Sequence, residues 1–282
     1  MDAVPFEMPS PLVPFVIVEA EVNDREPVKV LLDTGAAAPF TILISPDLAR
    51  RSGASSSGEP PVPSTGAVGV APVAYQPARI GAFRLGSLRL SGVRAGITAA
   101  VTAVGQQIGT KIDAIVGHEF LKARVVSIDY ATRLLDLSAP PGPEAQAIRF
   151  RLAPKRALTL VDVRLNGRGP FVMALDTGAS ATLVSPQTAK KAGLDEGRGA
   201  ALAGGGGLAP GGAQLTTATV SIGTVSRAKQ NVAVADVLGP VQAAAGAPLD
   251  GVLGADFLSS GRITIDYPGK RLWIQSGTAG TK

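Results

Sequence analysis

The stretch Val30-Leu31-Leu32-Asp33-Thr34-Gly35-Ala36 decides the fold of this chain, and Met173-Ala174-Leu175-Asp176-Thr177-Gly178-Ala179 repeats it. Each copy is an apolar run that ends in one carboxylate, one hydroxyl and a glycine. The apolar run predicts a buried strand, and the glycine lets the chain turn tightly after it. A carboxylate is costly to bury alone, so two of them in matching positions suggest that each is the other's partner.

The surroundings of the two stretches repeat as well, which indicates an internal duplication. Residues 13–36 are predicted to form a β-hairpin with Asn23-Asp24 at its turn. Residues 158–175 are predicted to form a second hairpin, with Asn166-Gly167 at the corresponding place. Each of the two stretches therefore ends the second strand of a hairpin.

A short helix is predicted after each hairpin, over residues 45–53 and 185–193. Both segments begin with Ser and Pro, which are favoured at the N-cap and at the first helical position. Both carry two cations in the last turn and stop at a glycine. Alternating strands are expected further along, over residues 78–97 and 214–235.

Each half closes with a second shared signature. It contains two apolar residues and a glycine, Ile115-Val116-Gly117 in the first half and Val252-Leu253-Gly254 in the second. An Ile-Asp-Tyr run follows each signature and ends at Tyr130 or Tyr267. The Asp-Thr-Gly copies are 143 residues apart and the closing signatures 137 apart, so the first half has six more residues between its motifs.

Between the helix and the alternating strands, each half has a turn-rich segment, over residues 52–70 and 203–212. One interpretation is a disordered surface loop. The other is a mobile hairpin that closes over a bound ligand. In that case the substrate-binding glycines would be Gly66, Gly69, Gly204, Gly205, Gly206 and Gly207.

Composition bounds the class of protein. The length of 282 residues allows one large or two ordinary domains, and 34 Gly with 22 Pro favour turns and short strands. The chain has no cysteine and no apolar run long enough for a transmembrane helix, and no signal-peptide pattern is visible. The net charge of +5 comes from scattered basic residues, whereas nucleic-acid sites are clustered, so we expect no nucleic-acid partner and no stable membrane insertion.

With both signatures in view, the chain resembles the pepsin/retropepsin family of aspartic proteases, and most closely the bacterial retropepsin-like proteins. The resemblance covers roughly residues 13–138 and 158–275. It implies a mainly β fold of two similar retropepsin-like barrel lobes with pseudo-two-fold symmetry and one short helix after each Asp-Thr-Gly loop. We expect an N-terminal lobe over residues 1–140 and a C-terminal lobe over 141–282, joined by a Pro-rich linker.

The resemblance also assigns the site. Asp33 and Asp176 would be the catalytic pair, and two carboxylates so close together share one proton. Thr34 and Thr177 would hydrogen-bond across the lobe interface and hold the loops rigid. Gly35 and Gly178 would support the pair through their backbone. Such a site needs no metal and no cofactor, and its partner is a peptide or protein substrate.

The sequence departs from the family pattern at several places. Neither turn-rich segment shows the Tyr-containing signature of pepsin-like flaps, and the first loop has Ala37 where the second has Ser180. Ala36 and Ala179 stand where pepsin-like enzymes usually have Ser or Thr, whose hydroxyl can stabilise an ionised Asp. Its absence predicts a less acidic pair and a pH optimum nearer weakly acidic or neutral.

The other recurring acids have simpler explanations. Asp113 and Asp250 precede an apolar run, where a turn or a strand start accounts for them. Asp129 and Asp266 alternate with apolar residues, so they are predicted to face away from the core. His118 is the only histidine, which leaves little for a Ser-His-Asp mechanism; it is predicted to be a surface or packed residue. We expect Trp273 in the core.

The sequence therefore predicts a single-chain aspartic endopeptidase. An alternative is a catalytically silent peptide-binding protein that uses the same cleft. A third arrangement keeps the chemistry but pairs each lobe with a lobe of another chain, so a homodimer stands beside the expected monomer. Because bacterial relatives of this kind are often exported, a periplasmic or secreted location is expected.

Overall fold

The computed structural model describes residues 3–25, 27–63, 74–194, 198–200 and 212–276. Both predicted hairpins are present. Strands β2 (Val16–Val22) and β3 (Pro27–Leu32) form the first, and β14 (Thr159–Leu165) and β15 (Arg168–Leu175) form the second. Their turns use the left-handed backbone that the sequence predicts, at Asn23, Asp24, Asn166 and Gly167.

Six strands close the first barrel, in the order β2-β3-β9-β4-β8-β7 and back to β2. The neighbours β3–β9 and β4–β8 are parallel, whereas the remaining pairs are antiparallel. The bounds of the four strands not yet given are β4 Ile42–Ile44, β7 Ala74–Leu85, β8 Leu88–Ile97 and β9 Ala114–Val116.

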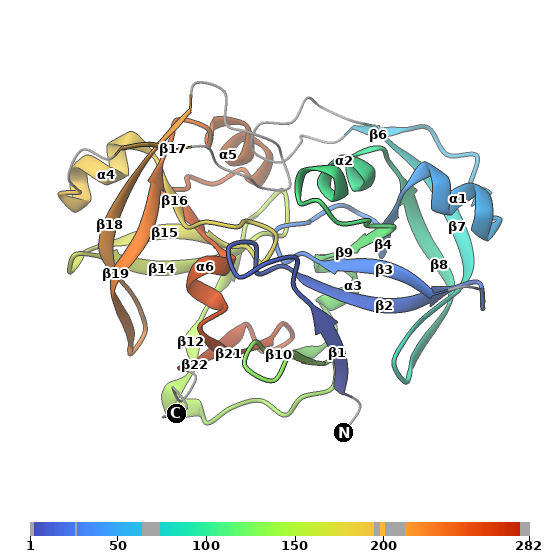
Figure 1. The fold of residues 1–282 in the computed structure, drawn as a ribbon, viewed down its shortest axis with the longest axis horizontal. Coiled ribbons are helices and arrows are strands. Elements are labelled where there is room, and N and C mark those ends of the chain that lie inside the picture. Colours follow the sequence, from blue (N-terminus) through green and yellow to red (C-terminus); the bar gives the residue numbers. More distant parts are fainter. Residues whose placement is uncertain (1–2, 26, 64–73, 195–197, 201–211, 277–282) are drawn as a thin grey trace.

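The second barrel repeats this topology strand for strand, in the order β14-β15-β20-β16-β19-β18 and back to β14. Its parallel pairs, β15–β20 and β16–β19, occupy the same places. Figure 1 shows the two barrels side by side. Two closed lobes of identical topology confirm the predicted fold class. The remaining strands of this barrel are β16 Leu183–Val184, β18 Ala213–Ile222, β19 Val225–Val234 and β20 Gly251–Leu253.

A further sheet joins the two halves below the barrels (Figure 1), with strand order β12-β22-β21-β10-β11-β1. Its central pair, β10 and β21, comes from different halves and is antiparallel from Val125↔Asp266 to Asp129↔Arg262. The Ile-Asp-Tyr runs thus meet across the pseudo-two-fold axis. The strands are β1 Ala3–Glu7, β10 Val125–Asp129, β11 Leu134–Asp136, β12 Ile148–Arg149, β21 Gly261–Asp266 and β22 Arg271–Ser276.

The two predicted helices are present as α1 (Pro46–Ser52) and α4 (Pro186–Ala192). Ser45 Oγ accepts from Leu48 N at 3.0 Å and Ser185 Oγ from Thr188 N at 3.1 Å, as an N-cap requires. Each half also has two helices that the sequence analysis does not predict. These are α2 Ala100–Gln107, α3 His118–Leu121, α5 Gly239–Ala245 and α6 Ala255–Leu258.

The short elements complete the described structure. Strands β5 and β6 pair with β7, β13 pairs with β14, and β17 pairs with β18. Their bounds are β5 Ser55–Ser56, β6 Val62–Pro63, β13 Arg151–Leu152, β17 Arg198–Ala200 and the 3-10 helix η1 Glu144–Gln146.

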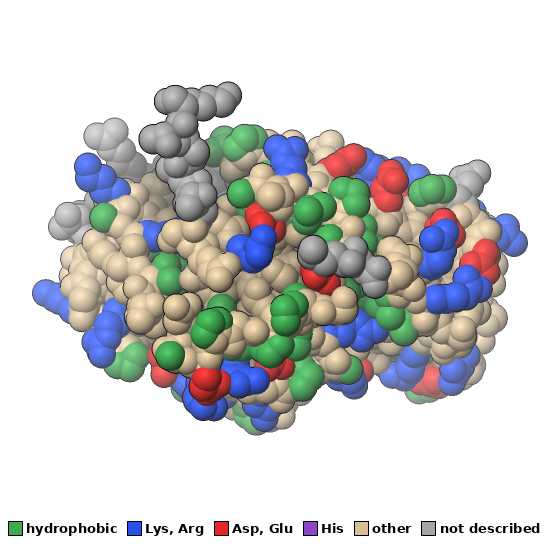
Figure 2. All heavy atoms as spheres, turned by 90° about the horizontal axis from the view of Figure 1, so that it is seen from below, with side chains coloured by type: hydrophobic (Ala, Val, Ile, Leu, Met, Phe, Trp, Pro, Cys, Tyr) green, Lys and Arg blue, Asp and Glu red, His purple; other side chains and the backbone are tan. Residues whose placement is uncertain are grey.

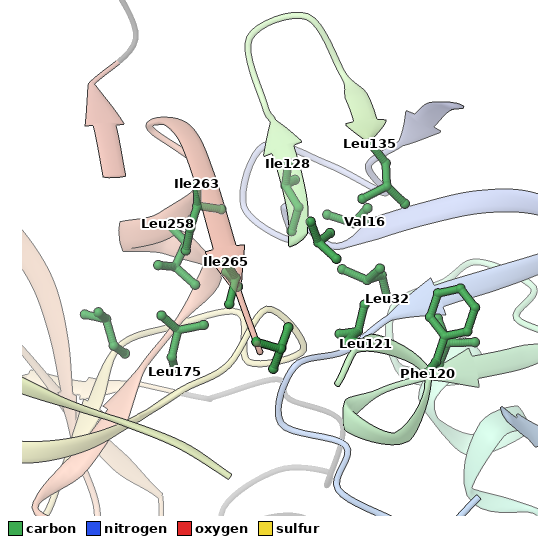
Figure 3. Packing of buried hydrophobic residues seen from close by; sticks show 14 of the residues in the cluster. Val16, Leu32, Phe120, Leu121, Ile128, Leu135, Leu175, Leu258, Ile263 and Ile265 are labelled. Atoms are coloured by element: carbon green, nitrogen blue, oxygen red, sulfur yellow. The ribbon is translucent and has the colours of Figure 1, made fainter. Parts of the chain in front are cut away.

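One hydrophobic cluster runs through both halves, so the lobes share a core. Figure 3 shows Val16, Leu32 and Ile128 of the first half beside Leu175, Leu258, Ile263 and Ile265 of the second. All of these side chains are essentially inaccessible to solvent. The apolar approach to each Asp-Thr-Gly copy therefore lies in the continuous core, as the sequence predicts for Leu32 and Leu175.

Trp273 is buried as predicted, and its indole Nε1 donates to the Pro143 carbonyl at 2.8 Å. Gly142 lies against the indole ring so closely that a Cβ there would collide with it. The Pro-rich join is thus packed onto the interlobe sheet. The boundary near residue 140 stays a prediction.

Asp129 and Asp266 correct one expectation. Neither joins a hydrophobic cluster, but both are buried rather than left on an open face. Asp129 accepts from the amides of Ala131 and Thr132 and from Arg262, which belongs to the other half. Asp266 accepts from the Gly269 amide and from Arg271. Burial is possible because each carboxylate is paired and hydrogen-bonded.

Many of the scattered basic residues in the described part of the chain pair with acidic ones. On the face drawn in Figure 2, basic side chains are spread over the surface and many lie beside acidic ones. The matched pairs on the first barrel include Arg84 with Glu21, Arg89 with Asp24 and Arg94 with Glu59. Among the described residues, no helix is both long and apolar enough to span a membrane.

Candidate active site

Asp33 and Asp176 stand at equivalent points, directly after β3 and β15. Asp33 N donates to the Val116 carbonyl at 2.9 Å, and Asp176 N donates to the Leu253 carbonyl at 3.0 Å. Each acidic residue therefore continues the parallel pairing of its strand with the closing signature, on β9 or β20. This explains why the two signatures occur together in each half.

The structure brings the two carboxyl groups together across the lobe interface. A Cβ on Gly35 would collide with the carboxyl of Asp176, and a Cβ on Gly178 would collide with that of Asp33. Each carboxyl thus lies over the glycine of the opposite loop. Glycine is required at both positions because any side chain would occupy the place of the opposing carboxyl.

Backbone amides orient the carboxyl groups. Asp33 Oδ1 accepts from Gly35 N at 2.8 Å and from Ala36 N at 3.0 Å. Asp176 Oδ1 accepts from Gly178 N at 2.7 Å. Since these bonds all use the Oδ1 atom, each carboxyl is held in a fixed orientation by its own loop.

Thr34 and Thr177 form a reciprocal set of hydrogen bonds between the loops. Thr34 Oγ1 donates to the Leu175 carbonyl at 3.0 Å and accepts from Thr177 N at 3.0 Å. Thr177 Oγ1 donates to the Leu32 carbonyl at 2.9 Å and accepts from Thr34 N at 3.1 Å. Both side chains are buried. These are the cross-lobe bonds that the resemblance implies.

Burial is the main cause of the unusual acidity of the pair. It raises the pKa of both carboxyl groups above the ordinary value, and the charge of Asp176 raises the pKa of Asp33 further. Both residues nevertheless keep part of their surface exposed. Two adjacent carboxyls of raised pKa that titrate together hold one proton between them over a wide pH range.

The closing signatures fix the loops from behind. Gly117 and Gly254 lie in such close contact with the loop backbones that a Cβ would collide with Ala36 or Ala181. His118 N donates to the Ala36 carbonyl at 2.9 Å, and Ala255 N donates to the Ala179 carbonyl at 2.7 Å. Each loop is therefore fixed on both sides, by the opposite threonine and by its own closing signature.

Asp113 and Asp250 have the structural role that the sequence predicts. Asp113 Oδ2 accepts from Lys29 N at 3.0 Å, and Asp250 Oδ2 accepts from Val172 N at 2.8 Å. Their other oxygens bind side chains of the predicted helices, from Arg51 and Thr188. These carboxylates join the hairpin to the helix in each half and lie outside the pair.

Asp256 supports the second loop and was missed by the sequence analysis. Its carboxylate accepts from Thr182 Oγ1 at 2.8 Å and from Gln230 Nε2 at 3.0 Å. Thr182 Oγ1 also accepts from Gly254 N at 3.3 Å. The only sequence signal was the position of Asp256 two residues after the closing glycine, which does not reveal its partners.

Of the predicted site residues, the structure brings Asp33, Thr34 and Gly35 together with Asp176, Thr177 and Gly178. The predicted substrate-binding glycines lie outside the described residues, and their role stays a prediction. These are Gly66, Gly69, Gly204, Gly205, Gly206 and Gly207.

Comparison with protein families agrees with the geometry. A family model of aspartyl proteases matches residues 18–120 and again residues 161–257. The two matches cover both barrels and both Asp-Thr-Gly copies, so the chain belongs to the aspartyl protease family. A search of curated proteins found no match to the chain. Family membership supports peptidase activity at the level of the family.

Proposed function

We propose that this protein is an aspartic endopeptidase in which Asp33 and Asp176 activate a water molecule that hydrolyses a peptide bond. The observation that carries the proposal is the placement of each carboxyl over the glycine of the opposite loop. A partly exposed pair of acids with raised pKa, held by reciprocal threonine bonds, supports general acid–base chemistry at a single point.

The shared proton defines the chemistry. The ionised carboxylate accepts a proton from water while the water oxygen attacks the amide carbon, and the protonated carboxyl donates to the carbonyl oxygen. Proton transfer to the amide nitrogen then breaks the C–N bond. No covalent enzyme intermediate forms. We assign neither role to one residue, since the pair titrates as a unit.

A catalytically silent peptide-binding protein is the second candidate. It would use the same cleft between lobes, but it would gain nothing from two adjacent carboxyl groups whose ionisation is costly. The pair arises here within one chain, because the β10–β21 pairing and the threonine bonds all join the two halves of the same molecule. This favours a monomer over a pairing of lobes between chains.

The test is cleavage of a peptide library from about pH 3 to 8, read by mass spectrometry. The native chain is compared with Asp176→Asn and with Asp162→Asn, an exposed aspartate paired to Arg151 on the same lobe. We expect Asp176→Asn to lose about 10²-fold to 10⁴-fold in kcat/KM, the usual contribution of a general acid or base. Asp162→Asn should cleave at the native rate.

Three outcomes are informative. Cleavage by Asp176→Asn at the native rate would disprove the site assignment. Absence of cleavage by the native chain at every pH, with peptide still bound, would favour the binding protein. Cleavage that is greatest at the acid end of this range, near pH 3, would contradict the weakly acidic or neutral optimum expected from Ala36 and Ala179.

A further inference from the structure

His118 lies directly behind the Asp33 loop. It follows the closing Gly117 and begins α3. Its backbone amide donates to the carbonyl of Ala36, and the amide of Ala36 in turn donates to Asp33 Oδ1. Only one residue therefore separates His118 from the hydrogen bonds that orient the Asp33 carboxyl.

The imidazole of His118 contacts the other half of the molecule. Its ring meets the edge of Tyr267 with centroids 5.7 Å apart and an interplanar angle of 69°. Tyr267 follows β21, donates its backbone amide to the Arg124 carbonyl, and packs against Phe150. Burial raises the pKa of Tyr267, a hydrogen bond with Thr159 opposes this, and the charge of Asp33 adds to the rise.

The equivalent place in the second half lacks an imidazole. Ala255 occupies it and makes the same backbone bond to its own loop, at Ala179. Tyr130, the counterpart of Tyr267, packs edge-on against Phe6, as Tyr267 packs against Phe150. Both halves thus have the backbone bond to the Asp-Thr-Gly loop, and both have the tyrosine. Only in the first half does this position carry a ring, the imidazole of His118, that contacts a tyrosine.

The surroundings of His118 suit a neutral ring. The residue is 7% exposed, and its Nδ1 is buried without a hydrogen-bond partner among the described residues. The charged and titratable groups around it are Tyr267 from the other half, Glu119 on its own helix and Lys122 directly after that helix. Burial lowers the pKa of His118 and Lys122 lowers it further, while Glu119 opposes them.

We propose that His118 is a positioning residue for Asp33: its neutral imidazole fixes the first Asp-Thr-Gly loop against Tyr267, and its protonation loosens that contact. A proton on the ring would place a cation in a buried site with no acceptor for Nδ1–H. The inference rests on the proposed function. It adds that activity falls at low pH because His118 takes up a proton, in addition to any effect of protonating the aspartate pair.

The activity test compares the pH profile of kcat/KM for the native chain, His118→Phe and His118→Ala. His118→Phe keeps an aromatic ring that cannot take a proton, so we expect its activity at pH 7 to stay within about threefold of native, as for shape-conserving replacements. Its acid limb should move to lower pH. His118→Ala introduces the residue that the second half has at this position, Ala255. It should lose on the order of tenfold in kcat, because the first Asp-Thr-Gly loop would be misplaced.

Glu119→Gln tests the proposal by a smaller change near His118. Its control is Glu7→Gln, which removes an exposed acid that pairs with Lys29 and lies far from His118 in the sequence. Removing the charge of Glu119 lowers the pKa of His118 further, so the acid limb should move slightly to lower pH; Glu7→Gln should leave it unchanged. An acid limb identical in the native chain and His118→Phe would overturn the proposal, because a purely structural ring would not alter the profile.

A stability measurement separates this proposal from the proposed function. A histidine whose folded pKa lies below its ordinary value of about 6.5 contributes stability above that pH, and the contribution falls as pH drops through the folded pKa. The Tm of the native chain minus that of His118→Phe should therefore decline from pH 7 to 5, whether or not any peptide is cleaved. Parallel Tm curves would refute the role of His118.

Discussion

At the scale of single residues, the pair of Asp33 and Asp176 has a cost in stability. Each carboxyl is oriented by amides of its own loop and lies against the glycine of the other loop. Burial raises both pKa values, which means that ionisation opposes folding. The pair persists because the threonines and the closing signatures hold both loops in place.

The pair should therefore make the protein less stable as pH rises. A carboxyl whose pKa is higher in the folded state than in the unfolded state binds more protons when folded. The free energy of unfolding therefore falls as pH rises above about 4, by up to about 1.4 kcal/mol per pH unit for each proton involved. Asp33→Asn removes one carboxyl and its repulsion of Asp176. Its unfolding free energy, measured by denaturant titration from pH 4 to 8, should fall less steeply than that of the native chain; equal slopes would contradict the raised pKa.

At the scale of elements, the strand pairings explain the spacing of the motifs. β3 with β9, and β15 with β20, are parallel neighbours, so the closing signature must return beside the Asp-Thr-Gly strand.

The hairpins and the capped helices α1 and α4 were predictable from local turn and cap residues. Helix α2 was not, because Ala100–Gln107 has two β-branched valines, a glycine and no side-chain cap. The four-residue α3 and α6 are too short to show a helical period.

The two Asp-Thr-Gly loops should behave as one cooperative element. Thr34→Val leaves the Thr177 amide and the Leu175 carbonyl without partners in a buried site, which costs about 1–3 kcal/mol. Thr177→Val should cost a similar amount, and the double variant less than the sum, since both act on one network. Thr264→Val, which loses one bond to Ser127 on the interlobe sheet, is the control. Chemical denaturation gives these values, and strictly additive losses would argue against a shared network.

At the scale of the whole molecule, the interlobe sheet makes the two halves one body. β10 and β21 pair across the pseudo-two-fold axis, Arg262 reaches Asp129 of the other half, and the core runs through both lobes. The two Asp-Thr-Gly loops are therefore brought together within one chain. The join packed on Trp273 adds to this association.

We accordingly predict a monomer. Light scattering after gel filtration should give about the chain mass of 28.5 kDa, and specific activity should not change with protein concentration, because both aspartates come from one molecule. A mass of twice that value, with activity that falls on dilution, would instead indicate that lobes of different chains supply the site.

The sequence by itself determined the duplication, the two hairpins, the capped helices and the six residues of the Asp-Thr-Gly copies, because these depend on local patterns of apolar residues, turns and caps. Only the tertiary structure decided how Asp129 and Asp266 are buried, which side chains bind Asp256, and that His118 meets Tyr267 from the other half. Those outcomes depend on which side chains meet after the lobes close. The contacts of Asp129 with Arg262 and of His118 with Tyr267 join residues more than a hundred positions apart, and such contacts leave no local pattern in a single sequence.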